Sequence, residues 1–287
     1  MTIVHKQIPF LMTSHTVTYN NDTEISNGFN NYFHSVYINS SSFDYEFKTI
    51  TNFPLITLKD FKLALNKFSS NTSSGPGGVP VYFLKNLNEN CHYILSIIFN
   101  QFIKYNYFPK EWKTALVTPL YKNSGDIIDI KSYRPISVTN IFSRIFERIM
   151  ANRLEKYLKG INFISKHQHG FQRGKNTLTN VLETYNFVTS EFDKGESVDV
   201  LYIDFEKAFD KVDIGILLNK LLFIKTPYYI LNWLTNFLLN RRQRVRVRGA
   251  VSDEVVVKSG VPQGCVISPL LFAVYVNDIF SLPINVI

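Results

Sequence analysis

The sequence predicts an α+β fold, and two kinds of pattern support the prediction. Apolar residues at helical spacing indicate amphipathic helices, for example over 57–68 and 140–158. Runs of β-branched and apolar residues indicate strands over 114–121, 198–203 and 242–248. A chain of 287 residues is long enough for one large domain or two small ones with a sizeable buried core.

The first fifty residues are polar and contain one predicted helix, Thr23–Tyr37, which we expect to pad the surface of the main domain. A second amphipathic helix is predicted over Thr57–Phe68, and Thr57 is its candidate N-cap. The Ser- and Gly-rich segment Ser69–Gly78 is typical of a flexible loop. A buried helix is predicted next, over Cys91–Tyr105.

Long helices are predicted in the middle of the chain, over Asn140–Leu158 and Asn176–Lys194. A buried strand is predicted to follow, over Val198–Ile203. The last third should form two short helices separated at Pro227 and then two strands on either side of Gly249.

The composition limits the class of protein. Lys and Arg number 31 against 23 Asp and Glu, a net charge of +8, which favours nucleic acid or an anionic membrane surface as partner. A basic globular protein without such a partner would have the same charge. Two cysteines are too few for a disulfide framework and indicate a reducing compartment without a zinc site. The first residues lack the sustained apolar core that is typical of a signal peptide, and no apolar run approaches the roughly 18–20 residues that a membrane helix needs. We therefore expect a soluble intracellular protein, nuclear or cytoplasmic, that does not bind a membrane.

Two segments have the composition of a catalytic site. In the first, Ser197–Asp213, the predicted strand ends at Asp204, so that a carboxylate stands at the edge of a sheet where Mg²⁺ and a phosphate could meet it. The second reads Gly260-Val-Pro-Gln-Gly-Cys-Val-Ile-Ser-Pro-Leu-Leu-Phe and predicts a tight turn that leads into a helix. Ser268 is the candidate N-cap of that helix and Pro269 its first residue.

These segments resemble two consecutive motifs of the reverse transcriptase palm, most closely those of non-LTR (LINE-like) retrotransposons, D-x-x-x-A-F-D and G-V-P-Q-G-x-x-x-S-P-L-L-F. Group II intron polymerases share parts of the motifs but fit the spacing less well. The third palm motif of the family, an aromatic-Ala-Asp-Asp hairpin, does not occur before Ile287. The resemblance implies a right-hand polymerase, with a linker-like segment over 1–50, fingers over 51–197 and a partial palm over 198–287.

The resemblance also implies a role for each motif residue. Asp204 matches a catalytic palm carboxylate that binds Mg²⁺ in two-metal nucleotidyl transfer. Taken alone, an aspartate at a strand end is more often a surface residue, and it is the surrounding D-F-E-K-A-F-D pattern that favours the catalytic interpretation. Asp210 is expected to cap or orient the turn that follows.

The remaining expected ligands of the nucleotide lie in three places. Lys122 and Arg134 match the cations that bind the β- and γ-phosphates, with Lys131 as an alternative to Lys122. Phe209 matches the aromatic residue that faces the sugar and excludes a 2′-hydroxyl, although it could simply be a core phenylalanine.

Gln263 and Gly264 match the element beneath the templating base and the incoming nucleotide, where glycine permits close approach of the backbone. A further match, Gln168-His-Gly-Phe-Gln-Arg-Gly, suggests a template contact through Arg173. It departs from the family pattern because Gln172 stands where Arg is usual.

Arginines alternate along the segment Arg242, Arg244, Arg246 and Arg248. In a strand all four would lie on one face, at a spacing that suits a phosphate backbone. An edge strand that charge keeps soluble would have the same pattern.

The resemblance implies an RNA-directed DNA polymerase that uses dNTPs, an RNA template and a DNA primer end. In a full-length protein an endonuclease would precede it and a thumb would follow. With one palm carboxylate out of three, we expect this chain to be an inactive fragment. The alternatives are a non-catalytic nucleic-acid-binding remnant of a decayed element and a relic with neither activity.

Overall fold

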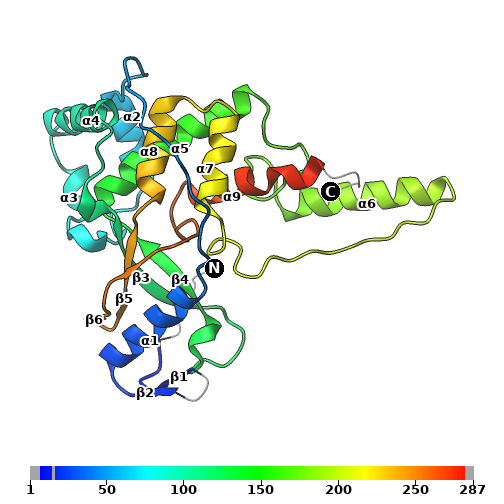
Figure 1. The fold of residues 1–287 in the computed structure, drawn as a ribbon, viewed down its shortest axis with the longest axis horizontal. Helices are drawn as coiled ribbons and strands as arrows, with labels where there is room; N and C mark the ends of the chain where they lie inside the picture. The colour runs from blue at the N-terminus through cyan, green and yellow to red at the C-terminus, as the bar shows by residue number, and fades with distance from the viewer. Residues whose placement is uncertain (1–6, 15–16, 282–287) are drawn as a thin grey trace.

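A computed structural model describes residues 7–14 and 17–281 (Figure 1). Its helices are α1 (Asp22–Ser35), α2 (Leu58–Asn66), α3 (Val81–Lys85), α4 (Glu89–Lys104), α5 (Ile141–Gly160), α6 (Thr177–Asp193), α7 (Ile214–Phe223), α8 (Tyr228–Leu238) and α9 (Ser268–Val276). Its strands are β1 (Met12–Ser14), β2 (Val17–Tyr19), β3 (Thr114–Tyr121), β4 (Tyr133–Val138), β5 (Arg242–Val247), β6 (Ala250–Val251) and β7 (Val255–Val256). Short 3-10 turns lie at Gly75–Gly77, Lys110–Trp112, Ile130–Ser132 and Asn277–Ser281. This mixture of helices and strands agrees with the predicted α+β class.

The main sheet is mixed. Its strand β3 pairs antiparallel with β4, with Tyr121 opposite Tyr133, and parallel with β5, with Thr114 opposite Arg242. On its other side β5 pairs with β6 and β7. The edge-strand interpretation of the arginine-rich segment is therefore wrong, because neighbours take up the hydrogen bonds on both sides of β5.

Two cores hold the elements in place. The larger core lies among the helices around α5, where the rings of Phe99 and Phe146 stack with centroids 4.7 Å apart. The smaller core lies between α1 and one face of the sheet, where Phe29 packs with Val117 and Val245. Figure 1 shows α1 lying across the sheet and the helices gathered at its opposite end. No helix in the described part of the chain is long and apolar enough to cross a membrane.

Most of the predicted boundaries are confirmed, because they follow from local sequence. Thr57 caps α2 in a reciprocal capping box with Asp60, and Pro227 separates α7 from α8. The predicted N-cap of α9 is wrong by one residue, because Ile267 and not Ser268 holds that position. Ser268 is instead its first helical residue, and its Oγ donates to the carbonyl of Pro262 at 2.8 Å.

The strand predicted over Val198–Ile203 is wrong. This segment forms no regular structure and is largely exposed, with 82% of Leu201 and 87% of Tyr202 accessible. A strand is stable only when its backbone groups pair with a neighbour. This segment pairs with no described strand, so its β-branched residues form no ladder.

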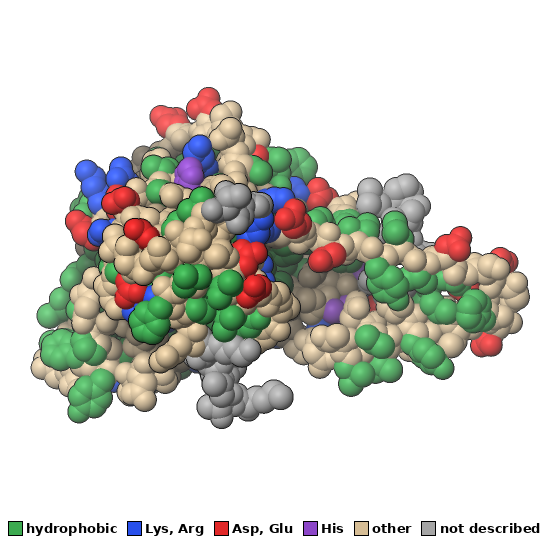
Figure 2. Space-filling view, turned by 90° about the horizontal axis from the view of Figure 1, so that it is seen from below, with side chains coloured by type: hydrophobic (Ala, Val, Ile, Leu, Met, Phe, Trp, Pro, Cys, Tyr) green, Lys and Arg blue, Asp and Glu red, His purple; other side chains and the backbone are tan. Residues whose placement is uncertain are grey.

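The helix α6 extends away from the body as an arm and has no buried residue (Figure 1). Its exposed apolar residues include Leu178, Val181 and Tyr185, and Figure 2 shows hydrophobic side chains along this arm. The carboxylate of Glu183 attaches the helix to the preceding loop. It lies 2.5 Å from Nδ1 of His167 and 2.6 Å from Nε2 of His169.

The pKa of Glu183 makes this attachment dependent on pH. Burial raises that pKa, but the hydrogen bonds with His169 and His167 and the charges of these two residues together bring it below its ordinary value of 4.5. The stabilisation is therefore fully present above about pH 4.5 and is lost as the pH falls through the folded-state pKa.

We predict that Glu183→Gln accelerates amide exchange over residues 165–183 several-fold at pH 7, because the charged acceptor is lost. The difference from the unmodified chain should shrink as the pH falls below the ordinary glutamate range. Hydrogen exchange read by mass spectrometry measures both effects. Glu191→Gln is the control, because among the described residues the Glu191 carboxylate pairs with Lys194 alone, at the far end of α6. Equal exchange in the two variants would contradict this account.

Candidate functional site

The two motif segments are joined backbone to backbone. The amide of Val261 donates to the carbonyl of Phe209 at 2.9 Å, and the amide of Gly260 donates to the carbonyl of Val212 at 2.8 Å. Gly260 has a φ of +89°, and a Cβ there would lie 2.7 Å from the carbonyl oxygen of Asp210. Only glycine therefore fits at this contact.

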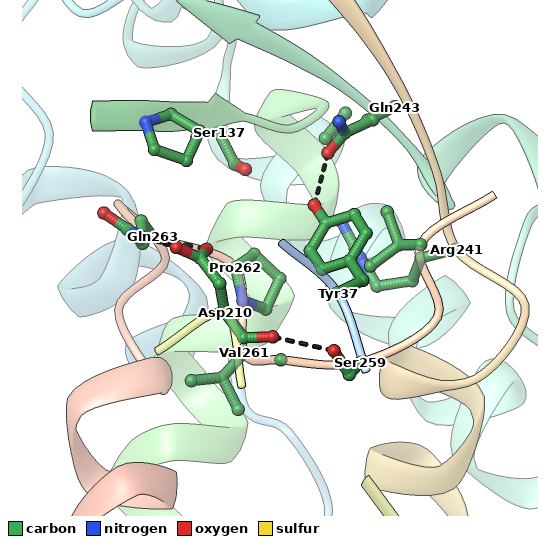
Figure 3. Close-up of a pocket in the computed structure, with 13 residues that line it drawn as sticks. Tyr37, Ser137, Asp210, Arg241, Gln243, Ser259, Val261, Pro262 and Gln263 are labelled. Carbon is green, nitrogen blue, oxygen red and sulfur yellow. Dashed lines mark hydrogen bonds between the residues drawn. The ribbon is translucent and has the colours of Figure 1, made fainter. Parts of the chain in front are cut away.

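Side chains reinforce the same junction. The amide nitrogen of Gln263 donates to both carboxylate oxygens of Asp210, at 3.0 and 2.8 Å, as Figure 3 shows. Burial raises the pKa of Asp210, and the hydrogen bond from Gln263 acts in the opposite direction. Ser259 Oγ donates to the Asp210 carbonyl at 2.7 Å. Asp210 thus orients its own turn, as predicted, and also fixes the second motif.

The turn at Gln263 and Gly264 lies against strand β4. The amide of Ser137 donates to the carbonyl of Gln263 at 2.8 Å. Gly264 has a φ of +97°, and a Cβ there would come within 3.2 Å of the Ser137 carbonyl oxygen. The glycine therefore permits close approach to β4, whereas the sequence suggested close approach to a ligand.

The buried carboxylate of Glu147 supports the segment that follows the turn at Gln263 and Gly264. Glu147 of α5 is fully buried, and its Oε1 accepts a hydrogen bond from the amide of Ile267 at 2.8 Å. Burial raises the pKa of Glu147. Arg241 is buried nearby, and its charge favours the ionised carboxylate. Sequence reasoning missed Glu147; the available signal was an acid beside the apolar residues of a core helix.

One cavity brings together four of the predicted nucleotide ligands. It measures about 320 Å³ and includes Lys122, Arg134, Phe209 and Gln263 in its wall. Lys122 follows the end of β3, Arg134 lies on β4, and the other two come from the joined motif turns. Segments that are far apart in the sequence thus meet around a single space.

The cavity is predominantly cationic. Burial lowers the pKa of Lys122, and the neighbouring charges of Lys207 and Arg134 lower it further. Lys122 Nζ donates to the carbonyl of Lys131 at 2.6 Å, while Arg134 is exposed and has no ion pair with a described carboxylate. Three cations and the single carboxylate of Asp210 line the cavity, an arrangement that suits a polyanion.

Phe209 has aromatic neighbours as well as a place in the cavity wall. Its ring stacks on Phe272 with centroids 5.1 Å apart, and the ring of Phe171 meets it edge-on at 5.9 Å. The core and sugar-facing interpretations are therefore compatible, because Phe209 both packs against other rings and lines the cavity.

Asp204 lies apart from this cavity wall. It is exposed and directly precedes Phe205, which does line the cavity. Mg²⁺ binding by a protein normally uses one or two carboxylates together with water and substrate phosphate. Among the described residues, no group of three or more His, Cys, Asp or Glu side chains is placed to hold a metal ion. The residues present therefore do not fit a two-metal centre, and Asp204 offers a single ligand.

The predicted nucleic-acid-binding arginines are only partly free of internal contacts. Arg242, Arg244 and Arg246 are exposed on the face of β5 opposite the buried face that packs on α1. Arg248 lies beyond the end of the strand and pairs with Asp22 at 2.5 Å.

Three more of the predicted nucleic-acid-binding arginines, Arg242, Arg244 and Arg173, also have partners within the protein. Arg242 pairs with Glu254 at 2.6 Å, and the Nε of Arg244 donates to the carbonyl of Ser252 at 3.1 Å. Arg173 lies 3.2 Å from Glu155, although its side chain is mostly exposed. A nucleic-acid strand would therefore have to share or replace these partners.

Comparison with known proteins decides the family. Residues 120–286, more than half of the chain, match the family described as reverse transcriptase (RNA-dependent DNA polymerase). The chain belongs to the reverse transcriptase family. This match includes both motif turns and all the cations of the cavity.

Curated relatives of this reverse transcriptase chain come from non-LTR retrotransposons. The protein named "Probable RNA-directed DNA polymerase from transposon BS" of Drosophila melanogaster is 32% identical over 225 residues, 78% of this chain and 25% of that protein. The corresponding polymerase from the X-element of the same fly is 32% identical over 211 residues, 73% of this chain and 23% of that protein.

A third relative, the Pol polyprotein of retrotransposable element R2 from Popillia japonica, is 28% identical over 172 residues, 60% of this chain and 24% of that protein. The chain thus spans about a quarter of the length of these relatives.

We predict that Glu147→Ala lowers the free energy of unfolding by about 2 kcal/mol or more, because the buried amide of Ile267 loses its acceptor. Urea unfolding measures this value. Glu155→Ala on the same helix is the matched control and should cost less than about 1 kcal/mol, because Glu155 forms surface ion pairs. Equal losses of unfolding free energy in the two variants would show that Glu147 does not support the turn.

Proposed function

We propose that this chain forms the nucleotide-binding part of an RNA-directed DNA polymerase of a non-LTR retrotransposon. The observation that carries the proposal is the meeting of Lys122, Arg134, Phe209 and Gln263 around one cationic cavity. In this proposal the fingers comprise residues 51–197 and the palm begins at 198. The substrates are dNTPs, an RNA template and a DNA primer. An upstream endonuclease and a downstream thumb would belong to the same protein, in line with the greater length of the relatives.

Each side chain has a role that its chemistry supports. The guanidinium of Arg134 can hold a phosphate through two parallel hydrogen bonds, while Lys122 provides a point charge. The ring of Phe209 would lie against C2′ of the sugar and leave no space for a 2′-hydroxyl. Gln263 and Gly264 would support the incoming base and the templating base from the turn fixed on β4.

We further propose that the chain binds a nucleotide but does not by itself extend a primer. Two-metal nucleotidyl transfer needs several carboxylates around the reacting phosphate, and Asp204 is the one residue here that matches such a ligand. Primer extension by the isolated chain that is lost in Asp204→Asn would overturn this part of the proposal.

A second candidate function is binding of nucleic acid without chemistry, favoured by the exposed arginines Arg242, Arg244 and Arg246. Phosphate contacts of this kind would make affinity fall steeply with salt. Binding of an RNA–DNA duplex that survives Asp204→Asn, together with no binding of dNTP, would support this candidate over the first.

We predict that Arg134→Gln and Lys122→Gln each weaken dNTP binding about tenfold, because each removes a charge-assisted hydrogen bond to phosphate. Titration calorimetry with a single dNTP measures the change. Lys156→Gln is the control, because Lys156 is an exposed cation of α5 that is absent from the cavity wall. An equal loss in all three variants would indicate a general charge effect and contradict the proposed site.

A further inference from the structure

The helix α1 forms one wall of the cationic cavity, although it lies far from both motifs in the sequence. Phe33 of α1 and Val36, the C-cap of the helix, line the same space as Lys122 and Arg134. The match to the reverse transcriptase family begins only at residue 120, so α1 lies outside it. The sequence suggested that this helix only pads the surface. Its place in the cavity wall calls for a more specific role.

The position of α1 is fixed by contacts with the sheet. The ring of Phe29 meets Tyr133 of β4 edge-on, with centroids 5.1 Å apart. The side chain of Gln243 on β5 donates to Asn30 at 3.0 Å and accepts from the hydroxyl of Tyr37 at 2.6 Å, the latter visible in Figure 3. The helix therefore presents its residues to the cavity from a rigid support.

Lys207 faces α1 from an unusual backbone conformation. Its φ is +54°, in the left-handed region that non-glycine residues seldom adopt. The amides of Asp210 and Lys211 donate to its carbonyl at 3.0 and 3.1 Å, and these bonds hold the conformation. Strain of this kind persists where the surrounding structure imposes it, and it is frequent at functional sites.

The ammonium of Lys207 is held by one residue of α1. Its Nζ donates a hydrogen bond to the hydroxyl of Tyr32 and lies 4.3 Å from the centroid of the Tyr32 ring. It forms no ion pair with a described carboxylate, although Asp210 and Glu206 act on it at longer range. Burial lowers the pKa of Lys207. An ammonium has three donors, so those that Tyr32 does not use remain for a ligand in the cavity that Lys207 lines.

We propose that Tyr32 holds Lys207 as a third phosphate-binding cation, so that α1 completes the triphosphate site of the incoming nucleotide. This inference rests on the proposed function and extends it to the segment that precedes the family match. With Lys122 and Arg134, Lys207 gives three cations against the one carboxylate of Asp210. A triphosphate carries enough negative charge to engage all three.

The test is a comparison of two lysines of the same turn. Lys207→Gln should weaken binding of a dNTP and of inorganic tripolyphosphate roughly tenfold, and leave weak binding of the nucleoside unchanged. Lys211→Gln is the matched control, because Lys211 is exposed and pairs with Glu206 at 3.2 Å. Lys207→Arg should retain most of the affinity, which separates loss of charge from loss of folding.

A double-mutant cycle then tests the role of Tyr32. Tyr32→Phe keeps the ring and removes the hydroxyl, so we expect a loss of several-fold in triphosphate affinity. In the Lys207→Gln background the same change should have no further effect, because Tyr32 acts through Lys207. If the fold losses of triphosphate affinity from the two changes instead multiply in the double variant, Tyr32 does not act through Lys207 and the proposal is overturned.

The outcomes separate this inference from the proposed function. If Arg134→Gln weakens triphosphate binding but Lys207→Gln does not, the nucleotide site remains and the role of Lys207 is refuted. If the unmodified chain does not bind the triphosphate at all, both proposals fail together. A loss in Lys207→Gln that is equal for the triphosphate and the nucleoside would also overturn the inference, because it would reflect damage to the fold.

Discussion

The contact between Gly260 and the turn at Phe209 and Asp210 is the constraint on which the rest of the site depends. Two carbonyl oxygens lie where a side chain on residue 260 would stand, 2.8 and 2.7 Å from the position of a Cβ. No other residue permits this approach without displacing a backbone segment. Because two backbone hydrogen bonds also close the contact, the turns that carry Phe209 and Gln263 cannot move independently.

The cavity is a consequence of this junction. Once the turns are joined, Gln263 reaches Asp210 on one side and β4 on the other, and β4 carries Arg134 toward the same space. The buried carboxylate of Glu147 then holds the start of α9 beneath the second turn. A rigid floor of this kind lets the cations of the sheet and of the first turn converge on one space, with Tyr32 of α1 holding Lys207.

Local patterns predicted the helices well and the long-range contacts poorly. The apolar stripe over 140–158 and the cap at Thr57 are properties of neighbouring residues, and both are present in the structure. The strand over Val198–Ile203 could not be predicted from its β-branched residues, because pairing with another segment decides whether it forms. The cavity residues came from motif resemblance, whereas the contact of Lys207 with Tyr32 depends on packing between distant segments, which no local spacing encodes.

The most direct test of the account compares Gly260→Ala with Gly249→Ala. Both glycines have a positive φ, +89° and +101°, but a Cβ at Gly249 would meet nothing within 4 Å. Backbone strain is therefore common to the two variants, and the steric contact belongs to Gly260 alone. Binding of a dNTP should fall roughly tenfold or more in Gly260→Ala and stay near the original value in Gly249→Ala. Equal binding by the two variants would contradict the claim that the junction at Gly260 builds the site.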